Sequence, residues 1–394
     1  MDDRWAPRAI LLIVGAFALA WVVPAGGILL VASRIDFDLD LDIGEFGNIP
    51  STGPPSGTDV HGLDAATGRK RWHRHFDDEF TVAGMDRGTT VVLEDDGMLL
   101  GIDGRTGRER WSQDLGTDAD VPVVGDGLVL AVDQKNTVRA FDVRSGRRHW
   151  HRKLTGHSAE TLAIAGGIGV VGEQGAAVGL DLATGNVRWR TPLTPGHHAA
   201  AAHGSLLFVR SGYHALVALD TTSGVAVWAF EAPPLTSSVD AFASLVAAEP
   251  IVGGPVVGVT LLDPQTPPSS TAALPTTSTV FLDALTGEER WRTVSGGLSS
   301  FSFDPQANTV YEYGEAQMLI ARDPATGASR WQINTDYGRL LATDGTVFSA
   351  EDHVLAFDES TGAHRWSSQS VGTDAAPVGL TDRTVVVVST QSTD

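Results

Sequence analysis

The 394-residue chain contains no cysteine, which excludes disulfide bonds, thiolate metal sites, cysteine nucleophiles and a lipoprotein anchor acylated on cysteine. A domain of this size has core enough to be exported without disulfides, so their absence does not indicate the cytosol. Lysine is almost as scarce, occurring only at Lys70, Lys135 and Lys153. Basic residues form no stripe, and a net charge of −20 repels phosphates, so nucleic acid is excluded as a partner.

Several enzyme signatures are also missing from the sequence. We find no GxSxG nucleophile elbow, no Walker loop, no HExxH zinc motif and no dinucleotide-binding fingerprint between a strand and a helix. The apolar fraction of 42% and the charged fraction of 19% are nevertheless ordinary for a globular protein with a sizeable core. The sequence therefore predicts a folded domain without the common catalytic motifs.

The one long apolar run lies near the N-terminus, where residues 9–33 carry no charge. Such a run can cross about 30 Å of hydrocarbon as a helix. Arg4 and Arg8 precede it and an acidic segment follows it, so the positive-inside rule predicts a cytoplasmic segment 1–8 and an exported remainder. A cleaved signal peptide is the alternative, with cleavage patterns ending at Ala20 or Ser33, although the run is long for one. We predict a single-pass anchor in the plasma membrane, with the rest of the chain on its extracytoplasmic side.

Residues 34–57 are predicted to be an acidic stalk and linker. Aspartates alternate with apolar residues from Asp36 to Asp42, and a Gly-, Pro- and Ser-rich stretch follows from Gly47. A calcium loop of the EF-hand type is disfavoured, because Ile43 stands where that loop needs glycine.

One pattern occurs eight times in the remaining chain and dominates its interpretation. Aspartate is followed by glycine four residues later and by tryptophan eight residues later. The aspartate can accept hydrogen bonds from the turn after a strand, the glycine supplies a positive φ, and the tryptophan suits packing between sheets. The eight copies are Asp64, Gly68 and Trp72; Asp103, Gly107 and Trp111; Asp142, Gly146 and Trp150; Asp181, Gly185 and Trp189; Asp220, Gly224 and Trp228; Asp283, Gly287 and Trp291; Asp323, Gly327 and Trp331; and Asp358, Gly362 and Trp366.

The spacing of the repeat predicts an all-β, eight-bladed β-propeller of four-stranded antiparallel blades over residues 58–394. Successive aspartates are 39, 39, 39, 39, 63, 40 and 35 residues apart, and a period near 40 with four short strands is typical of a propeller blade. The first motif has no strands before it, whereas residues 373–390 supply two strands with no motif after them. These two halves are expected to form one blade and to close the ring, which removes exposed sheet edges.

The repeat resembles the tryptophan-docking motif of the pyrroloquinoline-quinone (PQQ) quinoprotein family over roughly residues 58–390. That superfamily contains quinoprotein alcohol dehydrogenases and the non-enzymatic propeller of an outer-membrane-protein assembly lipoprotein, so the resemblance implies the fold but not one function. Its dehydrogenases hold calcium on acidic and amide groups in the central funnel, use an aspartate base and, when they oxidise alcohols, add a vicinal cysteine pair. The cysteine pair cannot exist here.

Several other acids and histidines are candidate ligands. Glu94, Asp95, Asp96, Glu173 and Glu312 lie near predicted hairpin turns, but their spacing marks no calcium site. His73 and His75, and likewise His149 and His151, share a strand face, which is also typical of a solvated outer strand. His197, His198 and His203 lie around a loop and are a weak metal candidate. We therefore predict no catalytic residue, no metal ligand and no cofactor.

One blade, between Asp220 and Asp283, is irregular, with two apparent insertions. Residues 263–278 are Pro-, Ser- and Thr-rich between two expected strands, and residues 232–245 precede the first strand of the blade. A plain loop, a glycosylated segment and a partner-contact loop are all compatible with this composition.

The functional hypothesis is a membrane-anchored, non-catalytic platform that binds an envelope protein or polymer. The alternative is a quinoprotein oxidoreductase that uses PQQ and calcium. A third hypothesis, an extracellular sensor head, requires a cytoplasmic partner for residues 1–8.

Overall fold

The computed structural model describes residues 57–77, 80–117, 119–155, 160–173, 175–194, 200–212, 215–232, 251–262, 277–295, 300–314, 317–336 and 338–390. The predicted anchor at 9–33 and the stalk up to residue 56 lie outside these ranges and remain predictions. No helix in the described part of the chain is long and apolar enough to cross a membrane.

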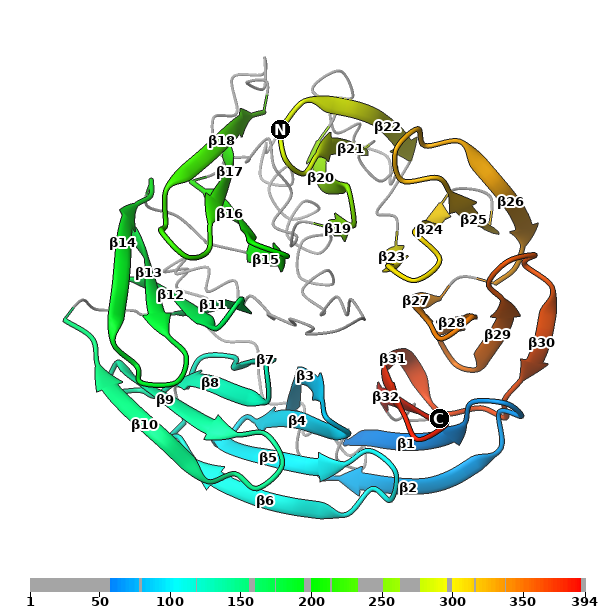
Figure 1. Cartoon of the computed structure of the whole chain (residues 1–394). Helices are drawn as coiled ribbons and strands as arrows, with labels where there is room; N and C mark the ends of the chain where they lie inside the picture. Colours follow the sequence, from blue (N-terminus) through cyan, green and yellow to red (C-terminus); the bar gives the residue numbers. More distant parts are fainter. Residues whose placement is uncertain are drawn as a thin grey trace, which may run out of the picture.

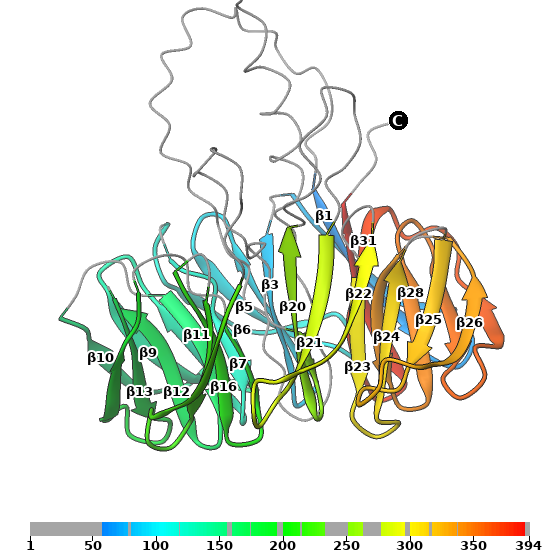
Figure 2. The ribbon, with the colours of Figure 1, turned by 90° about the horizontal axis from the view of Figure 1, so that it is seen from above.

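Eight four-stranded antiparallel sheets surround a central axis as the blades of a propeller (Figure 1). Seen from the side, the blades form a disc (Figure 2). The first four blades consist of β3 (Phe80–Asp86), β4 (Thr89–Glu94), β5 (Met98–Asp103) and β6 (Glu109–Asp114); β7 (Val123–Gly125), β8 (Leu128–Val132), β9 (Thr137–Asp142) and β10 (Arg148–Lys153); β11 (Glu160–Ala165), β12 (Ile168–Glu173), β13 (Ala176–Asp181) and β14 (Val187–Pro192); and β15 (Ala200–His203), β16 (Leu206–Ser211), β17 (Ala215–Asp220) and β18 (Ala226–Glu231).

The other four blades complete the ring. They consist of β19 (Ile251–Gly253), β20 (Val256–Leu262), β21 (Thr277–Asp283) and β22 (Glu289–Ser295); β23 (Ser300–Asp304), β24 (Thr309–Gly314), β25 (Met318–Arg322) and β26 (Ser329–Asn334); β27 (Arg339–Thr343), β28 (Thr346–Ala350), β29 (Val354–Asp358) and β30 (His364–Ser367); and β31 (Thr373–Thr381), β32 (Thr384–Thr390), β1 (Thr58–Asp64) and β2 (Lys70–Phe76). We number these blades 1 to 8 and call their strands A to D from the axis outward.

The position of a strand in its blade explains its composition. Inner and middle strands are covered on both faces by neighbouring blades, so β8 is apolar and buried throughout. The outermost strand has one solvated face, and β10 accordingly alternates exposed and half-buried residues. The hydrophobic core is thus divided into layers between adjacent blades, such as the cluster that joins Leu130 of blade 2 to Val178 of blade 3.

The eight motif tryptophans connect the blades in one direction around the ring, which confirms the packing role expected from the sequence. Each indole Nε1–H donates to the carbonyl oxygen of the residue after the motif aspartate in the next blade, over 2.8 to 3.2 Å. Each ring also covers the motif glycine of that next blade. The pairs are Trp72 on Gly107, Trp111 on Gly146, Trp150 on Gly185, Trp189 on Gly224, Trp228 on Gly287, Trp291 on Gly327, Trp331 on Gly362 and Trp366 on Gly68.

The motif glycines are required for two reasons. All eight have a positive φ, between 65° and 75°, as expected from the sequence. Each also lies too close to a tryptophan ring to carry a side chain. A Cβ added at Gly146, for example, would lie 2.6 Å from the Trp111 ring. The close tryptophan ring and the positive φ therefore both require glycine at this position.

Blade 8 is built from both ends of the described chain, as the sequence predicts. β1 pairs with β32 in continuous register from Thr58 opposite Thr390 to Asp64 opposite Thr384. Trp366 of blade 7 donates to the Ala65 carbonyl of blade 8 over 2.9 Å. The first and last strands of the propeller thereby become neighbours, and the ring is closed.

Both expected insertions fall in connections between strands of blade 5 or just before it. β20 ends at Leu262 and β21 begins at Thr277, so Thr277 and Ser278 belong to a strand and not to the insertion predicted at 263–278. The residues between these strands, and residues 233–250 between β18 and β19, lie outside the described ranges.

The contact between tryptophan and glycine can be tested by two matched substitutions. Gly146→Ala and Gly345→Ala both place a Cβ at a φ near +70°, but nothing lies within 4 Å of the added atom at Gly345. We expect Gly345→Ala to cost about 1 kcal/mol of backbone strain. Gly146→Ala should cost roughly 1–3 kcal/mol more, because the added methyl displaces the Trp111 ring. Thermal unfolding of the two variants measures the difference, and equal midpoints would contradict the docking role.

Candidate functional site

The eight motif aspartates are used within their own turns. In the turn after β13, Asp181 Oδ1 accepts hydrogen bonds from the Thr184 amide at 2.9 Å and from its hydroxyl at 2.7 Å. Its other oxygen pairs with Arg188, seven residues later, at 2.5 Å. The same arginine pairing occurs in six blades and links the strands of the hairpin. These aspartates brace turns, as predicted from the sequence.

Hydrogen bonding lowers the pKa of every motif aspartate. Arg188, followed by Thr184, holds the pKa of Asp181 at about 2. Blade 4 has valine in place of that arginine, and there the hydroxyls of Thr222 and Ser223 lower the pKa of Asp220. The eight carboxylates are therefore poised to remain ionised.

Two of the acids considered as calcium ligands form ion pairs with arginine. Glu173 is buried, pairs with Arg190 and accepts from the Thr155 hydroxyl at 3.1 Å. Glu312 is also buried and pairs with Arg322 at 2.5 Å. The arginines therefore balance the charges of these two carboxylates without a metal ion.

The other three acids of that group lie together at the end of one hairpin. Glu94 ends β4, and Asp95 and Asp96 form the turn that follows it. Asp96 accepts a hydrogen bond from the Met98 amide at 2.8 Å. This contact is a local turn brace within blade 1.

The glycines at 167, 169 and 172 have the GxGxxG spacing that dinucleotide-binding loops use. Two of them lie inside β12, which pairs with β11 on one side and β13 on the other. Dinucleotide binding needs this spacing at a turn from a strand into a helix, whose N-terminus holds the pyrophosphate. The spacing in blade 3 therefore forms no such site.

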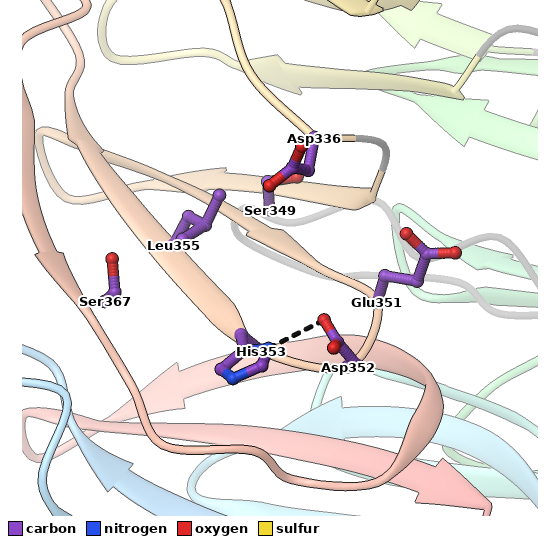
Figure 3. Close-up of a pocket in the computed structure, with 7 residues that line it drawn as sticks. All are labelled: Asp336, Ser349, Glu351, Asp352, His353, Leu355 and Ser367. Atoms are coloured by element: carbon purple, nitrogen blue, oxygen red, sulfur yellow. Dashed lines mark ion pairs between the residues drawn. The ribbon is translucent and has the colours of Figure 1, made fainter.

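A cavity of about 180 Å³ lies in blade 7, lined by Asp336, Ser349, Glu351, Asp352, His353, Leu355 and Ser367 (Figure 3). His353 Nδ1 lies 2.7 Å from Asp352 Oδ1. Burial, together with Asp352, Asp374 and Asp336, raises the pKa of Glu351. No three metal-ligating side chains of this lining meet within the described part of the chain, and the volume is below the roughly 300 Å³ that cofactor pockets usually exceed.

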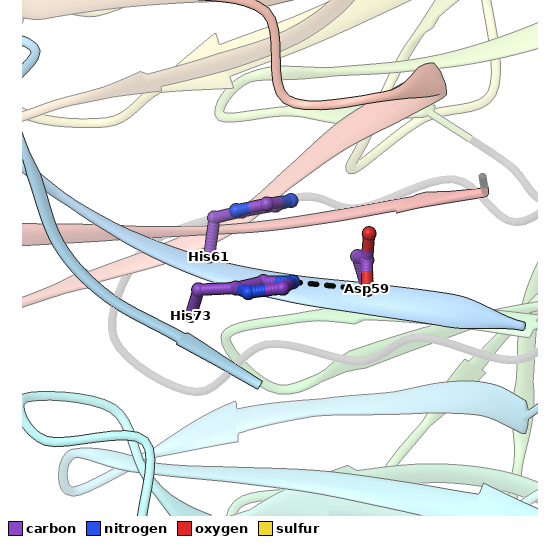
Figure 4. A group of neighbouring side chains, drawn as sticks. All are labelled: Asp59, His61 and His73. Atoms are coloured by element: carbon purple, nitrogen blue, oxygen red, sulfur yellow. Dashed lines mark ion pairs between the residues drawn. The ribbon is translucent and has the colours of Figure 1, made fainter. Parts of the chain in front are cut away.

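A second cluster occupies the outer two strands of blade 8. Asp59 and His61 of β1 face His75 and His73 of β2, and these are the directly opposed pairs of the hairpin. His73 Nε2 and His75 Nδ1 lie 3.0 and 2.8 Å from the same oxygen, Asp59 Oδ1. The rings of His61 and His73 stack with centroids 4.7 Å apart, and Figure 4 shows both rings extending toward the Asp59 side of the group.

His61 differs from its neighbours in being deeply buried. Its exposed fraction is 3%, and neither ring nitrogen makes a hydrogen bond of regular geometry among the described residues, although the backbone of Val371 approaches the ring. Burial first, and then the charges of Lys70 and His73, lowers the pKa of His61 to about 4; the charge of Asp59 and the backbone of Val371 offset this only in part. The ring is therefore neutral at physiological pH.

The remaining histidine candidates do not assemble in this way. His149 and His151 are exposed on β10, and His203 is exposed at the end of β15. His197 and His198 lie outside the described residues. Among the described residues, one group of three possible metal-ligating side chains is brought together, namely Asp59, His61 and His73.

Sequence reasoning selected His73 and His75 but missed Asp59 and His61, because it treated the outer strand alone. A signal was present in the motif itself. In the C–D hairpin, the residue eleven positions before the motif tryptophan pairs with the residue directly after that tryptophan. In blade 8 these two residues are His61 and His73. The arginine that directly precedes six of the eight tryptophans was missed as well, although it is visible in the repeat.

Exposed large apolar side chains occur in three consecutive blades. They are Val187 of blade 3, Val225 and Val227 of blade 4, and Leu285 and Val294 of blade 5. All but Val294 lie in a C–D turn or at the start of the strand that follows it. Val227 is 50% exposed at the position where six other blades place the arginine that pairs with the motif aspartate. Leu285 is 72% exposed at a turn position occupied by alanine, arginine, serine or threonine elsewhere. We call Val187, Val225, Val227 and Leu285 the apolar rim.

Comparison with known proteins agrees with this architecture. A family model described as outer membrane protein assembly factor BamB matches residues 56–203, 191–334 and 276–393. A search of the curated proteins finds no match.

Solved structures of similar shape include BamB, AztD and a quinohemoprotein alcohol dehydrogenase. BamB from Moraxella catarrhalis is 16% identical, with 93% of this chain and 95% of that chain covered and a TM-score of 0.50. Apo AztD from Citrobacter koseri is 12% identical, with 86% and 99% covered and a TM-score of 0.55. A quinohemoprotein alcohol dehydrogenase from Pseudomonas putida HK5 is 15% identical, with 83% and 70% covered and a TM-score of 0.50. At these identities the likeness shows the fold alone.

The turn aspartates predict how stability depends on pH. The folded-state pKa of Asp181, about 2, is below the roughly 3.9 of an unfolded aspartate. The ionised Asp181 therefore stabilises the fold fully above about pH 3.9, and this stabilisation is lost as the pH falls toward 2. Because all eight aspartates shift in this direction, we expect a steep fall in the unfolding midpoint between about pH 4 and pH 2. Asp181→Asn and Arg188→Gln should each make this fall shallower in thermal unfolding measured across the range. An unchanged acid limb in both variants would contradict the assignment.

Proposed function

Because the chain belongs to the family of the outer membrane protein assembly factor BamB, we propose that it is a non-catalytic binding platform of the cell envelope. In this proposal residues 9–33 anchor it in the plasma membrane, residues 34–57 space it from the bilayer, and the propeller stands on the extracytoplasmic side. Its partner is an envelope protein that presents an apolar segment. The observation that carries the proposal is the apolar rim.

The rim departs from the rest of the repeat in a way that the fold does not need. Other blades place polar or small residues, most often arginine, at the position of Val225, and six place a paired arginine at the position of Val227. Blade 4 gives up that ion pair and exposes two valines instead, with Val225 63% exposed. Adjacent exposed apolar side chains favour contact with another macromolecule.

The position of the rim suits a tethered platform. The chain enters the ring at Thr58, which lies opposite Thr390 and Phe76, at the end of the blade where B–C and D–A connections emerge. The rim lies at the opposite end, beside the C–D turns. A tether attached before Thr58 would therefore direct the apolar rim away from the membrane.

The surface can be tested by restoring the repeat. Val227→Arg re-creates the arginine of the other blades next to Asp220, so the fold should be unchanged or slightly stabilised while the apolar surface is interrupted. We expect a photo-crosslinker placed at Val225 in intact cells to yield one discrete adduct with an envelope protein. The adduct should fall at least tenfold when Val227→Arg is added.

The matched control uses blade 7, on the other side of the ring. A crosslinker at Ala363, the position equivalent to Val225, should give no such adduct. Equal labelling at both positions, or an adduct at Val225 that Val227→Arg leaves intact, would contradict the proposed surface.

The alternative function, a PQQ- and calcium-dependent oxidoreductase, is disfavoured in this proposal. The motif aspartates are committed to turns, and Glu173 and Glu312 are committed to arginines. We expect calorimetric titration of PQQ into the purified chain, with and without calcium, to give no heat of binding. Calcium-dependent binding with a micromolar or lower dissociation constant would instead establish the quinoprotein hypothesis and direct attention to alcohol and sugar oxidation.

A further inference from the structure

The position of His61 is unusual when the eight blades are compared. In blade 2 the equivalent residue is Arg139, which pairs with Asp133 at 2.6 Å. Only blade 8 places an imidazole ring there, with both nitrogens buried and without a regular hydrogen bond among the described residues. A buried polar group without a partner is costly, so its presence requires an explanation. In the other six blades the equivalent residue, eleven before the motif tryptophan, is apolar: Leu100, Val178, Val217, Val280, Ile320 and Leu355.

The surroundings of His61 supply further donor atoms on the same face of the sheet. His73 lies directly opposite on β2, and Asp59 is two residues earlier on β1. One ligand atom from each of Asp59, His61 and His73 lies within 4.8 Å of the other two. A tetrahedral zinc ion with bonds of about 2.0–2.1 Å needs donor atoms about 3.3 Å apart. The three side chains therefore need only small movements to bind the ion.

We propose that Asp59, His61 and His73 form a binding site for a divalent transition-metal ion, with zinc the best fit. Two imidazoles and one carboxylate suit zinc, whereas calcium and magnesium prefer oxygen ligands. The metal would take one ring nitrogen of His61 as a ligand, and the Asp59 carboxylate would balance part of the charge of the metal. This site is independent of the partner surface proposed above, since it lies in blade 8 and the apolar rim lies in blades 3 to 5.

His75 has a separate role in this arrangement. Its Nδ1 lies 2.8 Å from Asp59 Oδ1, the same oxygen that His73 approaches. It therefore orients the carboxylate from outside or moves in as the fourth ligand. His73 and His75 are 40% and 36% exposed at their side chains, so an ion can enter from the outer surface of the blade.

The metal would also act on ring closure. Its ligands come from β1 and β2, and β1 is the strand that pairs with β32 to close the propeller. An ion that binds only the folded blade stabilises it by mass action, so zinc should raise the unfolding midpoint as well as bind.

The test uses the full chain, purified in detergent, stripped with a chelator and then freed of the chelator. Titration with zinc chloride should show binding at the site with a micromolar or lower dissociation constant, and a rise of several degrees in the unfolding midpoint. Cobalt in place of zinc should give the visible absorption of a tetrahedral nitrogen and oxygen site. His73→Gln and His61→Leu should each weaken zinc binding at least tenfold and remove the cobalt spectrum.

The variants are chosen so that the fold is retained. Leucine already occupies the position of His61 in blades 1 and 7, and His73 is on the solvated outer strand. The matched control is His151→Gln, which changes the position equivalent to His73 in blade 2, where Arg139 stands opposite. It should leave binding and spectrum unchanged. Absence of zinc binding to the wild-type chain, or binding that survives both His73→Gln and His61→Leu, would overturn the proposal.

Discussion

The docking of each tryptophan on the glycine turn of the next blade is the contact on which the ring depends. A single blade cannot bury both faces of its sheet, so its stability comes from its two neighbours. The tryptophan covers the glycine and donates a hydrogen bond to a backbone carbonyl oxygen of the same turn. Because the contact is directional and repeats eight times, it sets the angle between blades. The last one, from Trp366 to Ala65, connects blade 7 to the closing blade 8.

The architecture could be predicted from the sequence because this contact needs three fixed residue types at a fixed spacing. The order of the blades followed from the positions of aspartate, glycine and tryptophan, and the strand count and the shared closing blade followed from the apolar runs between and after the motifs. The insertion in blade 5 was placed between the right strands but ended two residues late, since Thr277 and Ser278 are compatible with either loop or strand. The anchor at 9–33 stays a prediction, because the described residues begin at Gly57.

The candidate sites were harder to predict, since they arise from pairs of strands and not from local motifs. His73 was visible in the sequence, but its partner His61 is twelve residues away and looks like one more residue of a buried strand. The arginines that brace the motif aspartates were overlooked for the opposite reason. They occur so regularly that the sequence shows them only as frequent arginines. Their role becomes clear from the structure, where Arg188 lies 2.5 Å from Asp181.

A repeat protein offers its own internal reference, because each position has seven counterparts in the same fold. Residues that match their counterparts are accounted for by the fold. Residues that differ from their counterparts and destabilise the fold indicate a function other than folding. Val227 gives up an ion pair and exposes an apolar side chain, and His61 buries two nitrogens where leucine would suffice. The two departures lie in different blades and differ in chemistry. This separation favours a platform with two independent binding properties, one for an apolar protein segment and one for a metal ion near the closing strands.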